Sequence, residues 1–339
     1  MNVRYTNNFD FLRFFAAASI IFSHCFALYL GYSNVFLFDW HLLVGQTGLA
    51  ILLVISGYLI TQSWDKKPLV RQFLWKRSLR IVPGLIISIS MIMLIIGPLN
   101  TTFSIGEYFE NLTSLSTWAA VPFYTNGGAI GIFTNNPVTY VNAPLWTIPV
   151  EFGLYILVAF LGIIGIMKKR FVMLPFILIT ALAWITFYDS PVLNKIRFAI
   201  YFFLGSFLYM NRDKIKYRWW IGLLLVIPVL LTMGTEYMFI FAFIAIPYIV
   251  ILVAYANIPR LSGFGKWGDP SYGMYIYTYP IQQTILNFWP SIEIWQFIAL
   301  SFGCAIPVAY LSWHLVEKRA LSLKNIKLNY KSGNKTEIV

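Results

Sequence analysis

Long apolar segments alternate with short polar ones from about residue 9 to residue 316. A helix needs about 20 mostly apolar residues to cross the roughly 30 Å hydrocarbon core of a bilayer. Ten segments meet or approach that length, near residues 9–30, 44–64, 79–97, 146–167, 171–188, 196–211, 219–234, 237–256, 272–289 and 294–316. The fifth and sixth are short, and the break between the seventh and eighth is open to a different placement. The pattern predicts an all-α polytopic membrane protein with about ten transmembrane helices, nine or eleven being compatible with it.

The basic residues follow the predicted segments in a regular way. When the N-terminus is placed inside and the helices alternate, every Lys and Arg except Lys195 and Arg197 falls on the inner side. The long stretch 98–145, which would be an outer loop, contains neither Lys nor Arg. Cytoplasmic loops of membrane proteins carry an excess of Lys and Arg. The sequence therefore predicts that both termini are cytoplasmic.

Composition and charge agree with a membrane domain. The chain is 59% hydrophobic and 11% charged, whereas soluble domains carry about 25% charged residues. The net charge of +12 is spread over separate inner segments, which argues for orientation against a membrane and excludes a nucleic-acid partner. We expect residues 1–317 to form one integral domain and residues 318–339 a basic cytoplasmic tail. Cys25 and Cys304 lie in apolar segments without metal or redox spacing.

Arg13 and His24 lie on one predicted face of the first helix. Eleven residues separate them, and at about 100° per residue this spacing makes about three turns and about 16 Å along the axis. Charged groups inside a membrane are costly, so they mark functional sites that face the bundle interior or a water-filled cavity. The alternative is that Arg13 is an interfacial anchor and His24 a hydrogen-bonded interior residue.

Glu151 is the third ionisable group expected within the membrane. A helix rise of about 1.5 Å per residue puts it some 8–10 Å below the outer surface, at a depth that His24 also reaches. The sequence therefore permits a pair in which the carboxylate orients the imidazole for acid–base chemistry. Two unrelated buried groups, each satisfied by backbone or water, are the alternative.

Arg77 and Arg80 are one turn apart at the inner start of the third helix, so both side chains can point the same way. Clustered guanidinium groups suit a phosphate-bearing partner, although on the pattern alone a topology signal in contact with lipid headgroups is the favoured explanation. In the second helix, the small residues of Ser56-Gly57-Tyr58 are typical of helix packing. Ser56 has no base near it in sequence, which argues against an acyl-serine.

Together these residues resemble the membrane-bound acyltransferase family 3, which includes bacterial O-antigen and peptidoglycan O-acetylases. The resemblance covers about residues 7–320 and rests on short motifs in the family's order. They are Asn8-Phe-Asp10-Phe-Leu-Arg13 with His24, Ser56-Gly57-Tyr58-Leu59, Arg77-x-x-Arg80-Ile-x-Pro83, Leu145-Trp146-Thr147 with Glu151 and Tyr155, Phe203-Leu-Gly205, Ser271-Tyr272-Gly273-Met-Tyr275 and Val316-Glu317-Lys318. No single motif is specific, whereas the ordered set on a ten-helix chain is.

The resemblance implies an O-acetyltransferase of the bacterial inner membrane. It would move an acyl group, usually acetyl, from cytoplasmic acyl-CoA to a sugar hydroxyl of a cell-surface or lipid-linked glycan. Acyl-CoA, the glycan and membrane lipid are then the partners, and no metal or bound cofactor is expected.

The resemblance also implies roles for individual residues. His24 would be the general base, supported by Glu151, with Arg13 in the same catalytic site. Arg77 and Arg80 would bind the phosphates of CoA. The substrate path would include Ser56, Tyr58, Trp146 and Tyr275. Ordinary helix packing is the alternative for the three aromatic residues.

One departure from the family is Thr278, which stands where many members have a histidine. A transporter or flippase of lipid-linked sugars would also need intramembrane charges, but transporters often carry internal repeats and none is visible here. A structural or sensory membrane protein would leave Arg13, His24 and Glu151 unexplained.

Overall fold

The computed structural model describes residues 7–34, 38–113, 130–190 and 193–325. The regular elements within these residues are all helices, and no strand is named among them. The longer helices are α1 (Phe9–Leu30), α2 (Trp40–Lys66), α3 (Val70–Met91), α7 (Thr147–Ile163), α8 (Met173–Thr186), α9 (Arg197–Met210), α10 (Trp219–Leu231), α11 (Tyr237–Tyr255), α13 (Ser271–Phe288) and α14 (Ile294–Ser312). Short helices are α4 (Gly97–Asn100), α5 (Ile105–Asn111), α12 (Pro259–Ser262) and α15 (Lys318–Ser322). A helix therefore stands at each of the ten predicted segments.

The start of α3 differs most from the prediction. Helix α3 begins at Val70, well before residue 79, so Arg77 and Arg80 lie within it. A search for apolar residues misses this start because a helix that extends beyond the hydrocarbon can carry charges there. A 3-10 turn, Ala143–Trp146, precedes α7, and π-helical turns, Ile92–Ile96 and Trp313–Glu317, continue α3 and α14.

Not all ten helices are long enough to span a bilayer by length and composition. Within the described residues, six stretches satisfy both criteria: Phe9–Leu30, Trp40–Lys66, Val70–Asn100, Ala143–Ile163, Tyr237–Tyr255 and Ile294–Ser322. Helices α8, α9 and α10 are apolar but have 14, 14 and 13 residues, or about 20 Å of rise. A membrane protein is therefore evident, while the count of ten spans and the cytoplasmic termini stay predictions.

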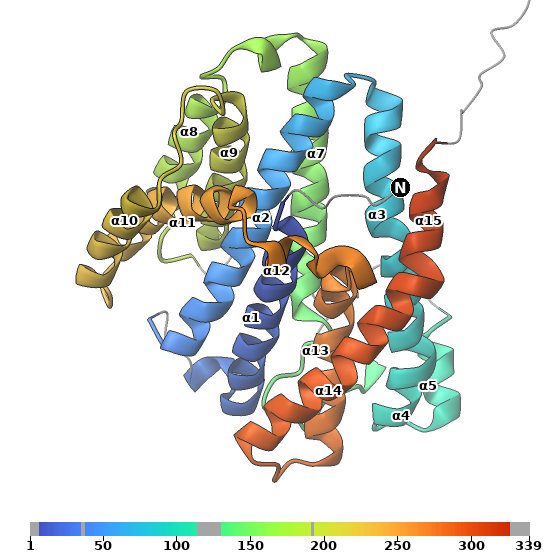
Figure 1. Ribbon diagram of the computed structural model, residues 1–339. Helices are drawn as coiled ribbons and strands as arrows, with labels where there is room; N and C mark the ends of the chain where they lie inside the picture. Colours follow the sequence, from blue (N-terminus) through green and yellow to red (C-terminus); the bar gives the residue numbers. More distant parts are fainter. Residues whose placement is uncertain (1–6, 35–37, 114–129, 191–192, 326–339) are drawn as a thin grey trace, which may run out of the picture.

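Helices α1 and α2 form the centre of the bundle (Figure 1). Helix α2 packs on α1 and on α9, whereas α13 packs on α1 and on α14. Helices α8 to α11 lie on one side of this centre, and α3, α14 and α15 lie on the other (Figure 1). The central helices thus have side chains that face both halves of the molecule.

Glycines allow α2 and α9 to approach closely. A Cβ on Gly57 would overlap the backbone carbonyl of Phe202, and a Cβ on Gly205 would overlap that of Val54. Small residues let helix backbones approach in this way in membrane proteins. The packing role expected for the small residues around position 57 is therefore observed, and it leaves Ser56 free to face another direction.

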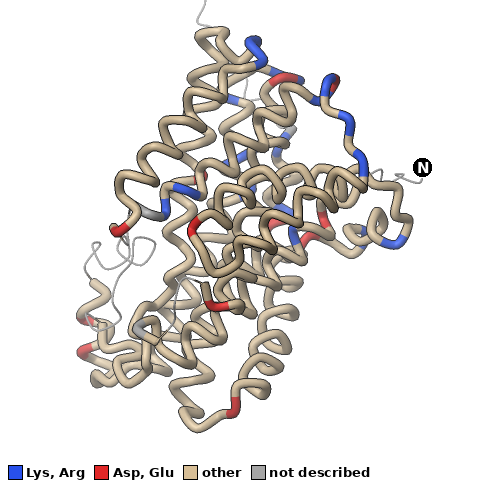
Figure 2. Tube along the Cα trace, turned by 90° about the vertical axis from the view of Figure 1, so that its left-hand side faces the viewer, with Lys and Arg blue, Asp and Glu red and all other residues tan. Residues whose placement is uncertain are grey.

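Charge is distributed unevenly along the bundle. Figure 2 shows Lys and Arg gathered over the upper part of the view, while the lower part is mostly uncharged, with a few acidic residues. A separation of this kind is typical of a protein oriented across a membrane.

Candidate functional site

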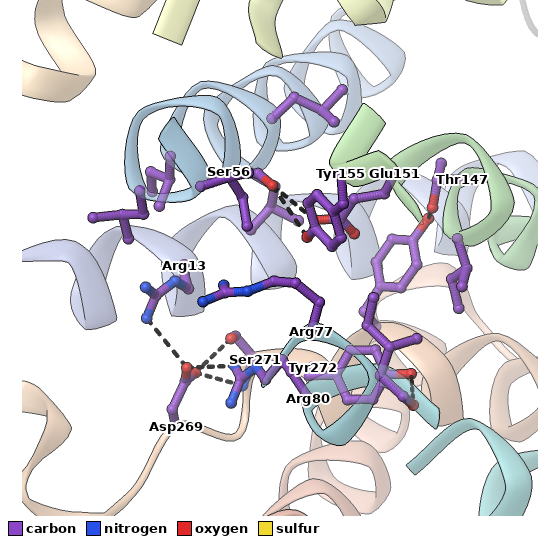
Figure 3. A pocket seen from close by; sticks show the side chains of 18 of the residues that line it. Arg13, Ser56, Arg77, Arg80, Thr147, Glu151, Tyr155, Asp269, Ser271 and Tyr272 are labelled. Atoms are coloured by element: carbon purple, nitrogen blue, oxygen red, sulfur yellow. Dashed lines mark hydrogen bonds and ion pairs between the residues drawn. The ribbon is translucent and has the colours of Figure 1, made fainter. Parts of the chain in front are cut away.

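A basic cavity of about 530 Å³ lies between α1, α2, α3, α7 and α13. Its polar lining includes Arg13, Lys76, Arg77, Arg80, Ser56, Ser63, Thr147, Glu151, Tyr155, Asp269 and Tyr275. Figure 3 shows the guanidinium of Arg77 between two polar groups: Ser56, Glu151 and Tyr155 on one side, and Arg13, Arg80 and Asp269 on the other.

Asp269 holds two of these arginines. Its Oδ2 lies 2.6 Å from Nη2 of Arg80 and 3.3 Å from Nη1 of Arg13, while Arg13 also pairs with Asp10 at 2.7 Å. Burial alone would raise the pKa of Asp269, but the positive charges of Arg80 and Arg13 outweigh it and lower that pKa to about 2. The carboxylate is therefore ionised at neutral pH and fixes both guanidinium groups.

Arg77 has no such carboxylate among the described residues. Its Nη2 donates to Ser63 Oγ at 3.4 Å, and its buried Nε has no hydrogen-bond partner in the described chain. Because Arg77 is the guanidinium of this cavity without a paired acid, it can donate to an anionic ligand.

Glu151 is bound by hydroxyl groups. Ser56 Oγ donates to its Oε1 at 2.8 Å, and the Tyr155 hydroxyl donates to the same oxygen. Residues 151 and 155 are one turn apart on α7, so both reach the cavity.

A second cavity, the histidine cavity, also has a volume of about 530 Å³. Its polar and aromatic lining includes Ser23, His24, Gln46, Tyr32, Tyr140, Trp146, Lys195 and Arg197. The imidazole of His24 lies edge-on to Tyr279, with ring centroids 5.4 Å apart. Neither of its nitrogens hydrogen-bonds to a residue that the structure describes.

The two cavities share one wall, formed by Leu49, Thr147 and Tyr275. The hydroxyls of Thr147 and Tyr275 lie 2.5 Å apart, and Tyr275 also donates to the Pro144 carbonyl at 2.6 Å. Arg13 and His24, on one face of α1 as their spacing predicts, line the two cavities on either side of this wall.

The structure separates some residues that the sequence put together. His24 and Glu151 line different cavities and are not hydrogen-bonded to each other. Tyr58 is 3% exposed and packs on Phe9, Tyr209 and Tyr255, so it lines neither cavity. Two residues along a helix turn a side chain by about 200°, which directs Tyr58 away from the cavity that Ser56 faces.

The remaining sequence candidates do reach the cavities. Trp146 lines the histidine cavity with Lys195 Nζ 5.0 Å from its ring centroid, and Tyr275 lines both cavities. Thr278 is buried and donates to the Met274 carbonyl at 2.5 Å, outside either lining. The described residues hold no cluster of three metal-ligating side chains.

Asp269 was missed by sequence reasoning. It follows Gly268 and precedes Pro270, a setting typical of a turn, and the arginines that it binds lie 189 and 256 residues away in the chain. The chain has only 13 acidic residues. The scarcity of carboxylates was the one feature of the sequence that could have singled out Asp269 as a partner for the arginines.

Comparison with known proteins identifies the family of the chain. The sequence model of acyltransferase family 3, described as an acyltransferase domain, matches residues 6–314. The chain is 30% identical to nodulation protein 10 of Rhizobium leguminosarum bv. viciae, over 94% of each protein. It is 28% identical to an O-acetyl transferase of Shigella phage Sf6, over 96% of this chain and 98% of that protein. No solved structure matches it.

These similarities extend over almost the whole chain and include every residue that lines the wall between the two cavities. They favour an enzyme over a transporter or flippase. The chain belongs to the membrane-bound acyltransferase family 3 and is an O-acetyltransferase.

Proposed function

We propose that the protein transfers an acyl group, most simply acetyl, from cytoplasmic acyl-CoA to a sugar hydroxyl of a cell-surface or lipid-linked glycan at the bacterial inner membrane. The observation that carries this proposal is the pair of cavities with different chemistry that meet at one wall. One cavity is rich in arginine, and the other holds a histidine without a hydrogen-bond partner in the described chain.

The basic cavity would bind the donor. Arg77 and Arg80, with Arg13 beside them, would hold the phosphates of CoA, since guanidinium groups bind phosphate through charge-assisted hydrogen bonds. The thioester would then extend past Ser56 and Glu151 toward the wall at Thr147 and Tyr275.

The histidine cavity would bind the acceptor. Trp146 and Tyr140 offer aromatic faces to a sugar ring. His24 would take the proton of the sugar hydroxyl while its oxygen attacks the thioester carbonyl. When the tetrahedral intermediate collapses, the carbon–sulfur bond breaks and the ester remains on the sugar. CoA leaves as a thiolate that takes up the proton held by the imidazolium of His24.

Glu151 would support this step from the donor side. Its carboxylate is held by Ser56 and Tyr155, so it can keep the inner face of the wall polar and position the thioester. Direct contact with His24 would require movement of the wall.

Acyl transfer by the full-length protein in nanodiscs, with radiolabelled acetyl-CoA and purified envelope glycan, tests the proposal. We expect His24→Ala to lower kcat by at least about a hundredfold, the usual scale of general-base catalysis. His314, an exposed histidine in the π-helical turn that follows α14, provides the control His314→Ala. A correctly inserted His24→Ala variant with full activity would exclude His24 as the base.

The donor site is tested in the same assay. Arg77→Ala combined with Arg80→Ala should raise the KM for acetyl-CoA at least about tenfold, because each arginine would lose charge-assisted bonds to phosphate. Arg260, exposed on α12, provides the control Arg260→Ala. An unchanged KM would assign Arg77 and Arg80 to membrane topology alone.

A further inference from the structure

Arg197 is a buried cation without an acidic partner. It begins α9, is 6% exposed, and lines the histidine cavity. Its Nη2 donates to Gln46 Oε1 at 3.0 Å, and its Cζ lies 4.5 Å from the ring centroid of Phe239. Its Nη1 has no hydrogen-bond partner among the described residues, and no described carboxylate forms an ion pair with it. A buried charge left uncompensated is strongly destabilising. An anionic ligand beside this guanidinium would remove that cost.

A second cation accompanies Arg197 in the same cavity. Lys195 precedes it by two residues and lies against Trp146. No acidic residue is present in the described lining of the histidine cavity. Arg197 and Lys195 are also the two basic residues that the predicted topology puts on the outer side, so membrane orientation does not account for them.

An apolar groove of about 260 Å³ begins on the other side of Arg197. It shares Gln46, Arg197 and Phe198 with the histidine cavity. The rest of its lining is almost entirely apolar and comes from α2, α9, α10, α11 and Met233, which follows α10. Arg197 therefore stands where a polar chamber meets a hydrocarbon-like one.

We propose that the acceptor is a glycan joined through a phosphate to a hydrocarbon chain, an inference that rests on the proposed acyl transfer. Its sugar occupies the histidine cavity, its phosphate lies at Arg197 and Lys195, and the beginning of its chain lies in the apolar groove. Arginine binds phosphate through paired hydrogen bonds, and the groove removes hydrocarbon from water. A free glycan would use neither Arg197 nor the groove.

Binding of a small mimic tests the anion site without any acyl transfer. The full-length protein in phosphatidylcholine nanodiscs is titrated with farnesyl phosphate and with farnesol, and bound ligand is counted by native mass spectrometry. We expect farnesyl phosphate to bind at least about tenfold more tightly than farnesol, the scale of a charge-assisted hydrogen bond. Arg197→Gln should abolish the difference, Arg197→Lys should retain part of it, and the surface control Arg260→Gln should retain all of it. Equal binding of the two probes by the unaltered protein would overturn the proposal.

Matched variants on one helix test the groove. Val229 lines the groove on α10, whereas Leu223 on the same helix is 69% exposed and does not. Val229→Trp should weaken binding of farnesyl phosphate, because the larger side chain fills the groove, and Leu223→Trp should leave it unchanged. Displacement of farnesyl phosphate by an equal concentration of phosphatidylglycerol would identify an ordinary phospholipid site and overturn the proposal.

Acetyl transfer then links the site to the reaction. A glycan linked to polyprenyl phosphate should have a KM at least about tenfold below that of the same glycan without the lipid phosphate. Arg197→Gln should raise only the former KM. Equal KM values overturn the lipid-phosphate inference while upholding acyl transfer. Absence of transfer to either glycan contradicts the proposed function, and the farnesyl phosphate titration still decides the binding site.

Discussion

Asp269 determines where two arginines of the basic cavity point. Its carboxylate pairs with Arg80 and Arg13, and it also accepts a hydrogen bond from the backbone N–H of Ser271 at 3.2 Å. A buried carboxylate with several donors is costly to remove, because the cations that it neutralises are left behind. Asp269 is therefore a positioning residue for the proposed donor site.

Asp269→Asn should lower the melting temperature of the purified protein by several degrees, because Arg80 and Arg13 lose their shared charge partner. The pKa of about 2 is below that of an unfolded aspartate, about 3.9. The stabilisation is thus fully present above about pH 4 and is lost only as the pH falls toward 2.

Thermal unfolding of both proteins at about pH 5 and about pH 8 checks this prediction. The difference between their melting temperatures should be the same at the two pH values. A difference that disappears at the lower pH would mean that Asp269 is already protonated there.

Periodicity predicts residues that share a helix but not residues that meet across the fold. The spacing of Arg13 and His24 was enough to put them on one face of α1, and both line cavities. The partners of Glu151 were not predicted, because matching depth in a membrane leaves the rotation of α7 undetermined. The observed partner of Glu151 is Ser56 on α2, and not His24.

At the scale of elements, the contact of α2 with α9 supports both cavities. Helix α2 supplies Leu49 to the shared wall and Ser56 to the basic cavity. It also supplies Gln46, which accepts a hydrogen bond from Arg197. The contact depends on Gly57 and Gly205, because a Cβ atom at either position would overlap a backbone carbonyl of the opposite helix. A wider spacing would move all three side chains.

Gly57→Ala should destabilise the protein by about 1–3 kcal/mol, the usual cost of overpacking. Gly153 on α7 provides a matched control, because a Cβ there meets nothing within 4 Å. Scanning fluorimetry of both variants in detergent should show a lower melting temperature for Gly57→Ala alone. Equal melting temperatures would mean that α2 and α9 can separate without cost.

Sequence reasoning located ten helices because apolar segments are the strongest signal in a membrane protein. It was less accurate where helices carry charge, as at Val70–Met91, whose first turns include Arg71, Lys76 and Arg77. Helix α5 was not predicted either, because Ile105–Asn111 is short and lies in a stretch interpreted as an outer loop.

At the scale of the whole molecule, the proposed route requires the basic cavity to open to the cytoplasm and the histidine cavity to the opposite side. The segments that test this are those next to the shorter helices α8, α9 and α10. Asp189 lies between α8 and α9, and Lys216 lies between α9 and α10. The ten-span topology puts them on opposite sides of the membrane.

Cysteine labelling in intact cells checks that topology. In a Cys25→Ser and Cys304→Ser background, a membrane-impermeant maleimide should modify the protein carrying Asp189→Cys. It should modify the protein carrying Lys216→Cys only after the cells are permeabilised. Labelling of both positions before permeabilisation would contradict the predicted spans.

The wall formed by Leu49, Thr147 and Tyr275 has a consequence for the cell as well as for the reaction. Two water-accessible chambers placed end to end would become a conduction pathway if nothing separated them, and a membrane potential acts with about 2.3 kcal/mol per unit charge at 100 mV. In the proposed topology, the hydroxyl pair at 2.5 Å and the leucine beside it would serve as an electrical seal. The acyl group, which is small and uncharged, would cross this seal, whereas salt ions would remain on their own sides.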